Sequence, residues 1–365
     1  MAIKKLRLKE LISTEPLSQF FLQREWLNPS NTFLILLIIG ILDEIIIGVL
    51  LGYLRSTNQV VGILDKKNIS LLLVSLVVEP SIWAFYIWFP NAAIQFFERL
   101  GQRGIIIGNQ TEWKKHVEKL VSWGSSKFYK LLAILSAAIL TIFAMFVIGR
   151  YQPTPWFFYV KWHFWILGLP RILASAYVAV YSVMWSIMTV ITLDRIFNTT
   201  RLEVIPYHED GAGGLAFIGI FILGMSRLAL ISVPFLIGET LFALYLGRGI
   251  QGQINLLAEL TILPVIALAI ITAPLLSCRR AMLFSKQDAI KNLREEIQRR
   301  LKISGPSITK EDLEILKTLI DFQAKLKRDF PILPFNVEAY KQVGINFLIS
   351  ILPVIISIIS LIIGR

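Results

Sequence analysis

The chain consists of long apolar stretches separated by short polar ones. Seven apolar stretches reach about 20 residues, the length at which a helix crosses a roughly 30 Å hydrocarbon core. They are 33–54, 70–96, 130–150, 164–193, 214–237, 256–277 and 343–363. The pattern predicts an all-α fold, a polytopic membrane helix bundle with about seven transmembrane helices.

Lys and Arg are distributed unevenly between the two sides that this topology defines. Of the 37 basic residues, 28 lie in residues 1–32, 97–130, 194–213 and 278–342, and seven lie in the alternate connections. Because basic residues stay on the cytoplasmic side, the N-terminus is predicted to be cytoplasmic and the C-terminus exterior. The formal net charge of +12 then points to the bilayer and its anionic lipid head groups as partners, and nucleic acid is not needed to explain it.

The composition excludes an ordinary soluble enzyme. Hydrophobic residues make up 55% of the chain and charged residues 17%, whereas soluble domains carry about 25% charged residues. One cysteine, Cys278, rules out a disulfide framework within the chain. No Ser-His-Asp order, His-Glu-x-x-His pair or P-loop is present, so we expect neither an enzyme nor a cofactor.

The domain organisation follows from the same pattern. We expect four parts: a cytoplasmic amphipathic N-terminal segment (1–32), a six-span membrane domain (33–277), a cytoplasmic helical hairpin (278–342) and a final transmembrane helix (343–365). In the hairpin, Thr309 and Asp312 are spaced to start the second helix. One hairpin has little core of its own, so its apolar faces pack either on the protein's own loops or on the same hairpin of another subunit, which would give a homo-oligomer.

A second cytoplasmic helix is predicted between the second and third spans. Asn109 and Glu112 have the spacing of a helix start, and the apolar residues Trp113, Val117 and Leu120 share one face. We expect this helix to lie on the inner leaflet of the membrane.

Ionisable residues inside predicted spans are expensive and usually face a partner or water. Four of them fall near mid-depth: Asp43, Glu44, Glu79 and Arg227. If all ionise, this layer carries a charge of minus two. It therefore forms either a pathway for cations or protons or an interhelical ion-pair cluster.

A second group lies nearer the exterior and comprises Arg171, Glu239 and Glu259. Snorkelling could bring all three to water, so a structural role is expected there.

The final span carries a polar stripe in an otherwise Ile, Leu and Val helix. Asn346, Ser350, Pro353, Ser357 and Ser360 recur at spacings of three and four, which places them on one face. Such a stripe suits a pore lining built from several copies of one helix, and it equally suits tight helix packing.

The loop 206–214 is the most motif-like part of the chain. His208, Glu209 and Asp210 offer ligands for a divalent ion, while the glycines that follow are ordinary turn residues. Whether the loop holds a metal or only makes a turn into the fifth span stays open at this stage.

Two resemblances appear at this point. His208-x-Asp210-Gly-Ala-Gly-Gly-Leu and Pro331-x-x-Pro334-Phe335 resemble a set of uncharacterised multi-pass bacterial membrane proteins, which implies a bacterial inner membrane and no particular activity. In layout alone, the predicted chain is similar to the insect chemoreceptor-like seven-span cation channels, whose final helix lines the pore of a tetramer. The Thr-Tyr that starts that family's final-helix signature is replaced here by Ala339-Tyr340.

The sequence thus predicts an oligomeric channel or transporter for small cations or protons. The candidate pathway residues are the acidic layer and the polar stripe of the final helix. The alternative is a membrane scaffold or sensor that does not transport and recruits a cytoplasmic partner through residues 280–335.

Overall fold

The computed structural model describes residues 27–54, 73–102, 105–107, 110–151, 169–206, 208–228, 230–231, 250–304 and 309–334, together with 341, 345 and 348. Most of the predicted N-terminal segment and nearly all of the final span lie outside these residues.

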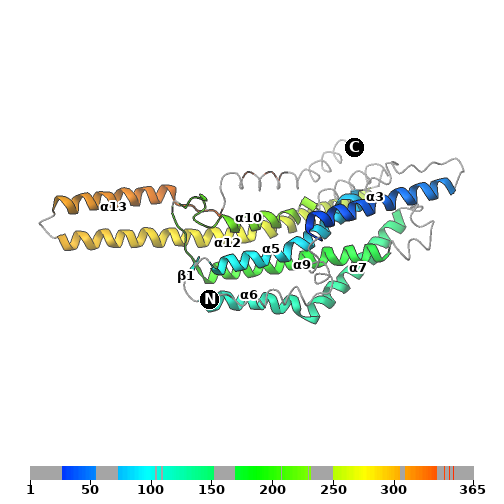
Figure 1. The fold of residues 1–365 in the computed structure, drawn as a ribbon, viewed down its shortest axis with the longest axis horizontal. Coiled ribbons are helices and arrows are strands. Elements are labelled where there is room, and N and C mark those ends of the chain that lie inside the picture. Colours follow the sequence, from blue (N-terminus) through cyan, green and yellow to red (C-terminus); the bar gives the residue numbers. More distant parts are fainter. Residues whose placement is uncertain are drawn as a thin grey trace.

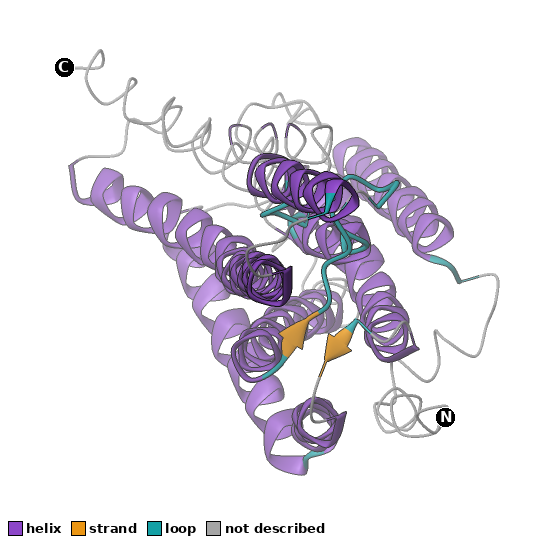
Figure 2. Ribbon diagram, turned by 90° about the vertical axis from the view of Figure 1, so that its left-hand side faces the viewer, coloured by secondary structure: helices purple, strands orange, loops and turns teal. Residues whose placement is uncertain are grey.

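Within them the fold is helical, as predicted, and most helices lie along the long axis of the molecule (Figure 1). The helices are α3 (Pro29–Leu54), the π-helix η2 (Val74–Val78), α5 (Glu79–Gln102), α6 (Gln110–Ser125), α7 (Lys127–Tyr151), α9 (Leu169–Thr199), α10 (Ala216–Met225), α12 (Ile250–Ser304) and α13 (Lys310–Asp329). Two short strands, β1 (Ile106–Ile107) and β2 (Arg201–Leu202), form a two-residue antiparallel ladder between the helices (Figure 2).

Helix α9 lies at the centre of the bundle and packs against α5, α6, α7 and α12. Helices α5 and α9 run parallel, because Trp83 contacts Ser175 and Phe89 contacts Trp185 farther along both helices. Helices α6 and α7 run antiparallel to α9, since the contacts descend on α9 from Arg195 with Trp123 to Tyr181 with Tyr129.

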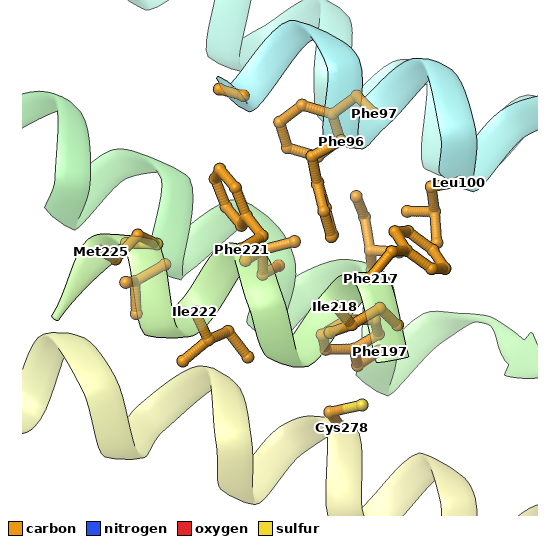
Figure 3. Close-up of a cluster of buried hydrophobic side chains, with 14 of the residues drawn as sticks. Phe96, Phe97, Leu100, Phe197, Phe217, Ile218, Phe221, Ile222, Met225 and Cys278 are labelled. Carbon is orange, nitrogen blue, oxygen red and sulfur yellow. The ribbon is translucent and has the colours of Figure 1, made fainter. Parts of the chain in front are cut away.

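A cluster of buried apolar side chains lies where α5, α9, α10 and α12 meet (Figure 3). The rings of Phe96 and Phe221 stack with centroids 4.4 Å apart. Phe217 packs beside them, and the buried Cys278 of α12 reaches the same cluster. Aromatic side chains bury large apolar areas, so this cluster fixes the short helix α10 inside the bundle.

Helix α12 differs from its predicted boundaries. The sequence pattern ends a span at residue 277 and begins a separate hairpin helix, but the structure has one continuous helix of 55 residues. At 1.5 Å per residue it is about 80 Å long. Because residues 275–304 contain neither Gly nor Pro, nothing interrupts the helix where apolar residues give way to charged ones.

Helix α13 runs beside the end of α12, and the pair projects away from the other helices (Figure 1). It begins as predicted, with Thr309 as N-cap and a capping box completed by Asp312. The backbone N–H of Asp312 donates to Thr309 Oγ1 at 3.2 Å, and this satisfies one of the helix's free amide groups.

The position of α6 corrects another expectation. Its apolar face, formed by Trp113, Val117 and Leu120, is buried against α9 and is therefore not available to the inner leaflet. The spacing predicts an apolar face but does not say what covers it.

By length and composition, α9 is the one helix in the described residues that is apolar enough to cross a membrane by itself. Helices α6 and α7, which meet at a bend of 53°, pass the same test together.

Candidate functional site

The site that the structure builds most completely is an ion pair between Glu79 and Arg171. Glu79 is the first residue of α5 and directly follows the π-helix η2, while Arg171 lies in the first turn of α9. Arg171 Nε donates to Glu79 Oε1 at 3.0 Å and to Oε2 at 2.8 Å, and its Nη2 lies 2.7 Å from Oε2. A planar guanidinium that meets a carboxylate through two nitrogens fixes the orientation of both groups.

Three neighbouring side chains extend the pair into a hydrogen-bond network. Ser175 Oγ donates to Glu79 Oε1 at 2.7 Å, and Trp83 Nε1 donates to Ser175 Oγ at 3.2 Å. On the other side, Arg171 Nη2 donates to Ser75 Oγ at 3.0 Å. The network therefore joins η2, α5 and α9, and we call these five residues the Glu79 centre.

The Glu79 centre is largely shielded from solvent. The side chain of Glu79 is 12% exposed and that of Arg171 is 27% exposed. A third helix approaches closely, because a Cβ added at Gly40 of α3 would lie 3.2 Å from the carbonyl oxygen of Ser75 and 3.6 Å from Arg171 Nη2. Glycine at this position lets α3 approach the guanidinium.

The chemistry of the Glu79 centre follows from this geometry. The carboxylate charge is balanced by one guanidinium, and both of its oxygens accept hydrogen bonds, as a buried charge requires. A π-helical turn beside an ionisable residue is a frequent feature of functional sites, because it leaves backbone groups outside the regular helical ladder.

The predicted pathway residues have other neighbours in the structure than their expected depths in the membrane suggest. Glu79 pairs with Arg171, which the sequence pattern placed in the outer group. Arg227 is exposed, with its guanidinium 5.3 Å from the centroid of the Trp88 ring. Position within one predicted span gives neither the face on which a residue lies nor how far that helix is displaced along its neighbour, and this explains the different grouping.

Other predicted residues lie outside what the structure describes. Asp43 and Glu44 belong to α3, but their side chains are not among the described ones, and the same holds for Glu259 in α12. Glu239 and the stripe residues Asn346, Ser350, Ser357 and Ser360 also lie outside the described residues.

Sequence reasoning missed three members of the Glu79 centre, namely Ser75, Trp83 and Ser175. The signal was present, because Ser75 and Trp83 lie four residues to either side of Glu79, and Ser175 lies four residues after Arg171. Residues four apart share one helix face, so each charged residue has a polar neighbour on its own face.

The loop 206–214 is organised around the carboxylate of Asp210. Its Oδ1 accepts hydrogen bonds from the backbone N–H groups of Ala212 and Gly214 at 3.0 and 2.9 Å, and its Oδ2 accepts from that of Ala216 at 3.1 Å. His208 Nδ1 lies 2.9 Å from Oδ1. Partial burial raises the pKa of Asp210, but the amide hydrogen bonds and His208 outweigh it, so the pKa lies below its usual value.

Glycines complete this turn. Gly211, Gly213 and Gly214 have positive φ angles of 65°, 70° and 85°, which other residues adopt only with strain. A Cβ on Gly213 would also collide with the side chain of Val204. Among the described residues no group of three or more His, Cys, Asp or Glu could hold a metal ion. Asp210 holds the start of α10 in place, while Glu209 is exposed at the tip of the loop.

No family model, curated protein or solved structure matches this chain. The residues themselves are therefore the basis for a functional conclusion.

Proposed function

We propose that this protein is a multi-pass membrane channel or transporter for small cations or protons, with the Glu79 centre beside its pathway. The observation that carries the proposal is a shielded, hydrogen-bonded ion pair next to a π-helical turn, in a bundle whose helices α3 and α7 expose apolar side chains. The proposal includes the seven-span topology, a cytoplasmic N-terminus and the bacterial inner membrane.

The surface of α7 supports placement in a bilayer. Eight large apolar side chains between Phe128 and Ile142 are 42% to 76% exposed. Helix α3 exposes Leu34, Ile38 and Leu42 in the same way. Soluble proteins rarely expose continuous apolar surface of this kind, whereas hydrocarbon favours it.

Contacts between helices indicate the depth of the ion pair. Tyr129, beside Lys127 and Lys130 at the start of α7, contacts Tyr181 of α9. Arg171 lies ten residues before Tyr181, which is about 15 Å along the helix. If the two lysines mark the cytoplasmic interface, the ion pair lies near the middle of a roughly 30 Å hydrocarbon core.

Two further carboxylates favour a pathway for cations or protons over a neutral interhelical ion-pair cluster. Asp43 and Glu44 follow Gly40 by three and four residues on α3, so their backbone lies within about 6 Å along the helix from the contact with the Glu79 centre. Arg171 neutralises one carboxylate at this level, and a remaining excess of negative charge attracts cations or retains protons.

The complete protein is proposed to be a homo-oligomer. The final helix, with its polar stripe at Asn346, Ser350, Ser357 and Ser360, would then line the path, as in the channels whose layout the sequence resembles. Anionic lipid head groups on the cytoplasmic side are the proposed counter-charge for the basic loops.

The test is a flux assay in liposomes with potassium, sodium and protons, one at a time. Asp43→Asn and Glu79→Gln should lose or alter flux, because each removes a carboxylate of the proposed pathway. Since Glu79→Gln removes the charge that balances Arg171, the double variant Glu79→Gln, Arg171→Leu shows whether a loss of flux comes from destabilisation. Glu209→Gln, at the exposed tip of the loop, is the matched control and should conduct like the wild type. Normal flux in both pathway variants would refute the acidic layer, and absence of wild-type flux would refute transport.

One observation favours a second function, a scaffold or sensor that recruits a cytoplasmic partner. The α12–α13 hairpin projects from the bundle and exposes Leu301, Leu313, Ile320 and Phe322. This reading predicts a specific soluble partner whose binding requires residues 280–335, together with no conductance in liposomes.

A further inference from the structure

Polar residues continue along α9 from the Glu79 centre toward the cytoplasmic half of the bundle. Ser175, Ser182, Ser186 and Thr189 follow one another at spacings of seven, four and three. These spacings place them along one side of the helix. We call them, with Trp185 between them, the α9 polar line; from Ser175 to Thr189 it extends about 21 Å at 1.5 Å per residue.

Three buried polar atoms in this line have no hydrogen-bond partner within the part of the chain that the structure describes. They are Ser182 Oγ, Trp185 Nε1 and Thr189 Oγ1. Their residues are 2%, 5% and 0% exposed. A buried polar atom without a partner loses its hydration and gains nothing in return, so several in one place indicate ordered water.

Nearby hydroxyls on α9 do have partners, so the lack of a hydrogen-bond partner is not general for buried Ser and Thr in this helix. Ser186 Oγ donates to the carbonyl oxygen of Ser182, and Thr192 Oγ1 donates to that of Met188, both at 2.8 Å. The indole N–H of Trp185 cannot form such a bond, because it lies too far along the side chain to reach a backbone carbonyl of its own helix, as a short hydroxyl does.

A fourth buried group adjoins the line from another helix. The hydroxyl of Tyr129 on α7 is also without a partner in the described part of the chain, and its ring lies 5.8 Å from that of Tyr181. Tyr181 directly precedes Ser182, so Tyr129 lies beside α9 next to the line.

We propose that a file of internal water molecules follows the α9 polar line and connects the cytoplasmic half of the bundle with the Glu79 centre, and that protons are the permeant species. Each water would accept the Trp185 N–H or exchange hydrogen bonds with the hydroxyls of Tyr129, Ser182 and Thr189. Hydroxyls and an indole can order single waters, but they supply neither the ring of carbonyls nor the carboxylates that replace the hydration shell of a metal cation. The water file stands by itself, and its role in transport rests on the proposed function.

Replacing hydroxyl by methyl tests the hydration directly. In a dry core, Thr189→Val would leave the thermal unfolding midpoint unchanged or raise it, because it removes an unsatisfied polar atom. In a hydrated file the same change removes a partner of a bound water, so the midpoint should fall, by about 3 °C or more.

Thr192→Val on the same helix is the matched control, since its hydroxyl serves the carbonyl of Met188, and its midpoint should stay within about 1 °C of the wild type. Ser182→Ala, again compared with Thr192→Val, repeats the test, should Thr189→Val not fold. Thr189→Ser keeps the hydroxyl and should recover most of the loss. Unchanged or raised midpoints in both Thr189→Val and Ser182→Ala would overturn the water file.

Proton flux in liposomes separates this inference from the proposed function. Thr189→Val should reduce proton flux about tenfold or more, since one broken link interrupts a single file, while Thr192→Val conducts normally. Normal proton flux in Thr189→Val would reject the file as the pathway and leave the proposed function standing. Absence of wild-type flux for every ion, with lowered midpoints, would reject transport and leave the internal water established.

Discussion

At the scale of single residues, the Glu79–Arg171 pair is asymmetric in its consequences. Two buried charges that satisfy each other add little net stability, because both lose hydration on burial. Removing one partner leaves the other charge buried without compensation. The pair is therefore best understood as a feature that fixes α5 against α9.

This asymmetry predicts that Arg171→Leu lowers the free energy of unfolding by about 3–5 kcal/mol. The double variant Arg171→Leu, Glu79→Gln should recover a substantial part of that loss, since no charge is left buried. Thermal or detergent-induced unfolding of the purified variants measures both. Equal stability of the single and double variants would contradict a shielded pair.

Asp210 gives a prediction with a defined pH dependence. Because its pKa is lowered in the folded protein, the carboxylate stabilises the fold fully above about pH 5, and this stabilisation is lost as the pH falls through the folded pKa. Asp210→Asn, which removes the charge and replaces one of the two accepting oxygens by an NH2 group, should cost about 1 kcal/mol. The difference in unfolding midpoint between wild type and variant should be constant from pH 5 to 7 and shrink toward pH 3. A difference that grows on acidification would refute this assignment.

The residue scale also shows where sequence reasoning stopped. Glu79 was identified because charge inside an apolar span is unusual. Its partner was not, because the level of Arg171 depends on how far α9 slides along α5, and no local pattern encodes that distance. In the loop 206–214, the residue types favour a turn without excluding a metal site, and the amide hydrogen bonds to Asp210 show that it makes a turn.

At the scale of elements, α7 has two contrasting faces. Tyr129, Ala133, Ala137 and Thr141 recur every four residues and are buried, and α9 is the long helix that covers them. Small residues at this spacing let two helices approach closely, while the opposite face exposes large apolar side chains.

Enlarging the buried face should therefore be costly. Ala137 is fully buried, so Ala137→Leu should lower the free energy of unfolding by about 1–3 kcal/mol through overpacking. Ile134→Phe, on the exposed face of the same helix, is the control and should have little effect in detergent or lipid. A loss as large in the control would show that the packing of α7 differs from the one described.

Helices α12 and α6 show what periodicity can and cannot predict. The apolar and charged halves of α12 were both recognised as helical, yet their continuity was not, because a change in composition resembles a boundary even where no Gly or Pro interrupts the chain. In α6 the apolar face was predicted correctly. Its partner is α9 and not the membrane, since amphipathic spacing is the same for both.

At the scale of the whole molecule, the described bundle has two halves. One half presents an apolar outer surface and contains α3, the C-terminal part of α7 and the Glu79 centre. The other half contains the aromatic core around Phe96 and Phe221, and there α5 exposes Asn91, Gln95 and Arg99 to solvent. The α12–α13 hairpin extends beyond this second half (Figure 1).

This division differs from the hydropathy pattern of α5. Hydropathy extends the predicted second span to residue 96, but the exposed polar residues of α5 begin at Asn91. Tyr86 of α5 and Tyr129, at the basic start of α7, both contact Tyr181 of α9. The basic start of α7 therefore lies at the same level of the bundle as Tyr86. Aromatic side chains packed in a protein core and aromatic side chains in a bilayer have similar hydropathy. Composition alone therefore cannot locate the interface between the two halves.

The most direct test of this account measures depth at Ile139, which is 66% exposed on α7. Ile139 lies ten residues after Tyr129, as Arg171 lies ten before Tyr181, so on the outer surface it lies on the same side of the Tyr129–Tyr181 contact as the ion pair. A nitroxide on Ile139→Cys in liposomes should be far more accessible to oxygen than to a water-soluble nickel chelate, whereas one on Ser122→Cys should show the reverse. The buried thiol of Cys278, whose pKa burial raises, should not react with the label, and unmutated protein checks this. High oxygen accessibility at Ile139 would place the Glu79–Arg171 pair in the membrane interior, and nickel accessibility equal to that at Ser122 would place it in water and contradict the account.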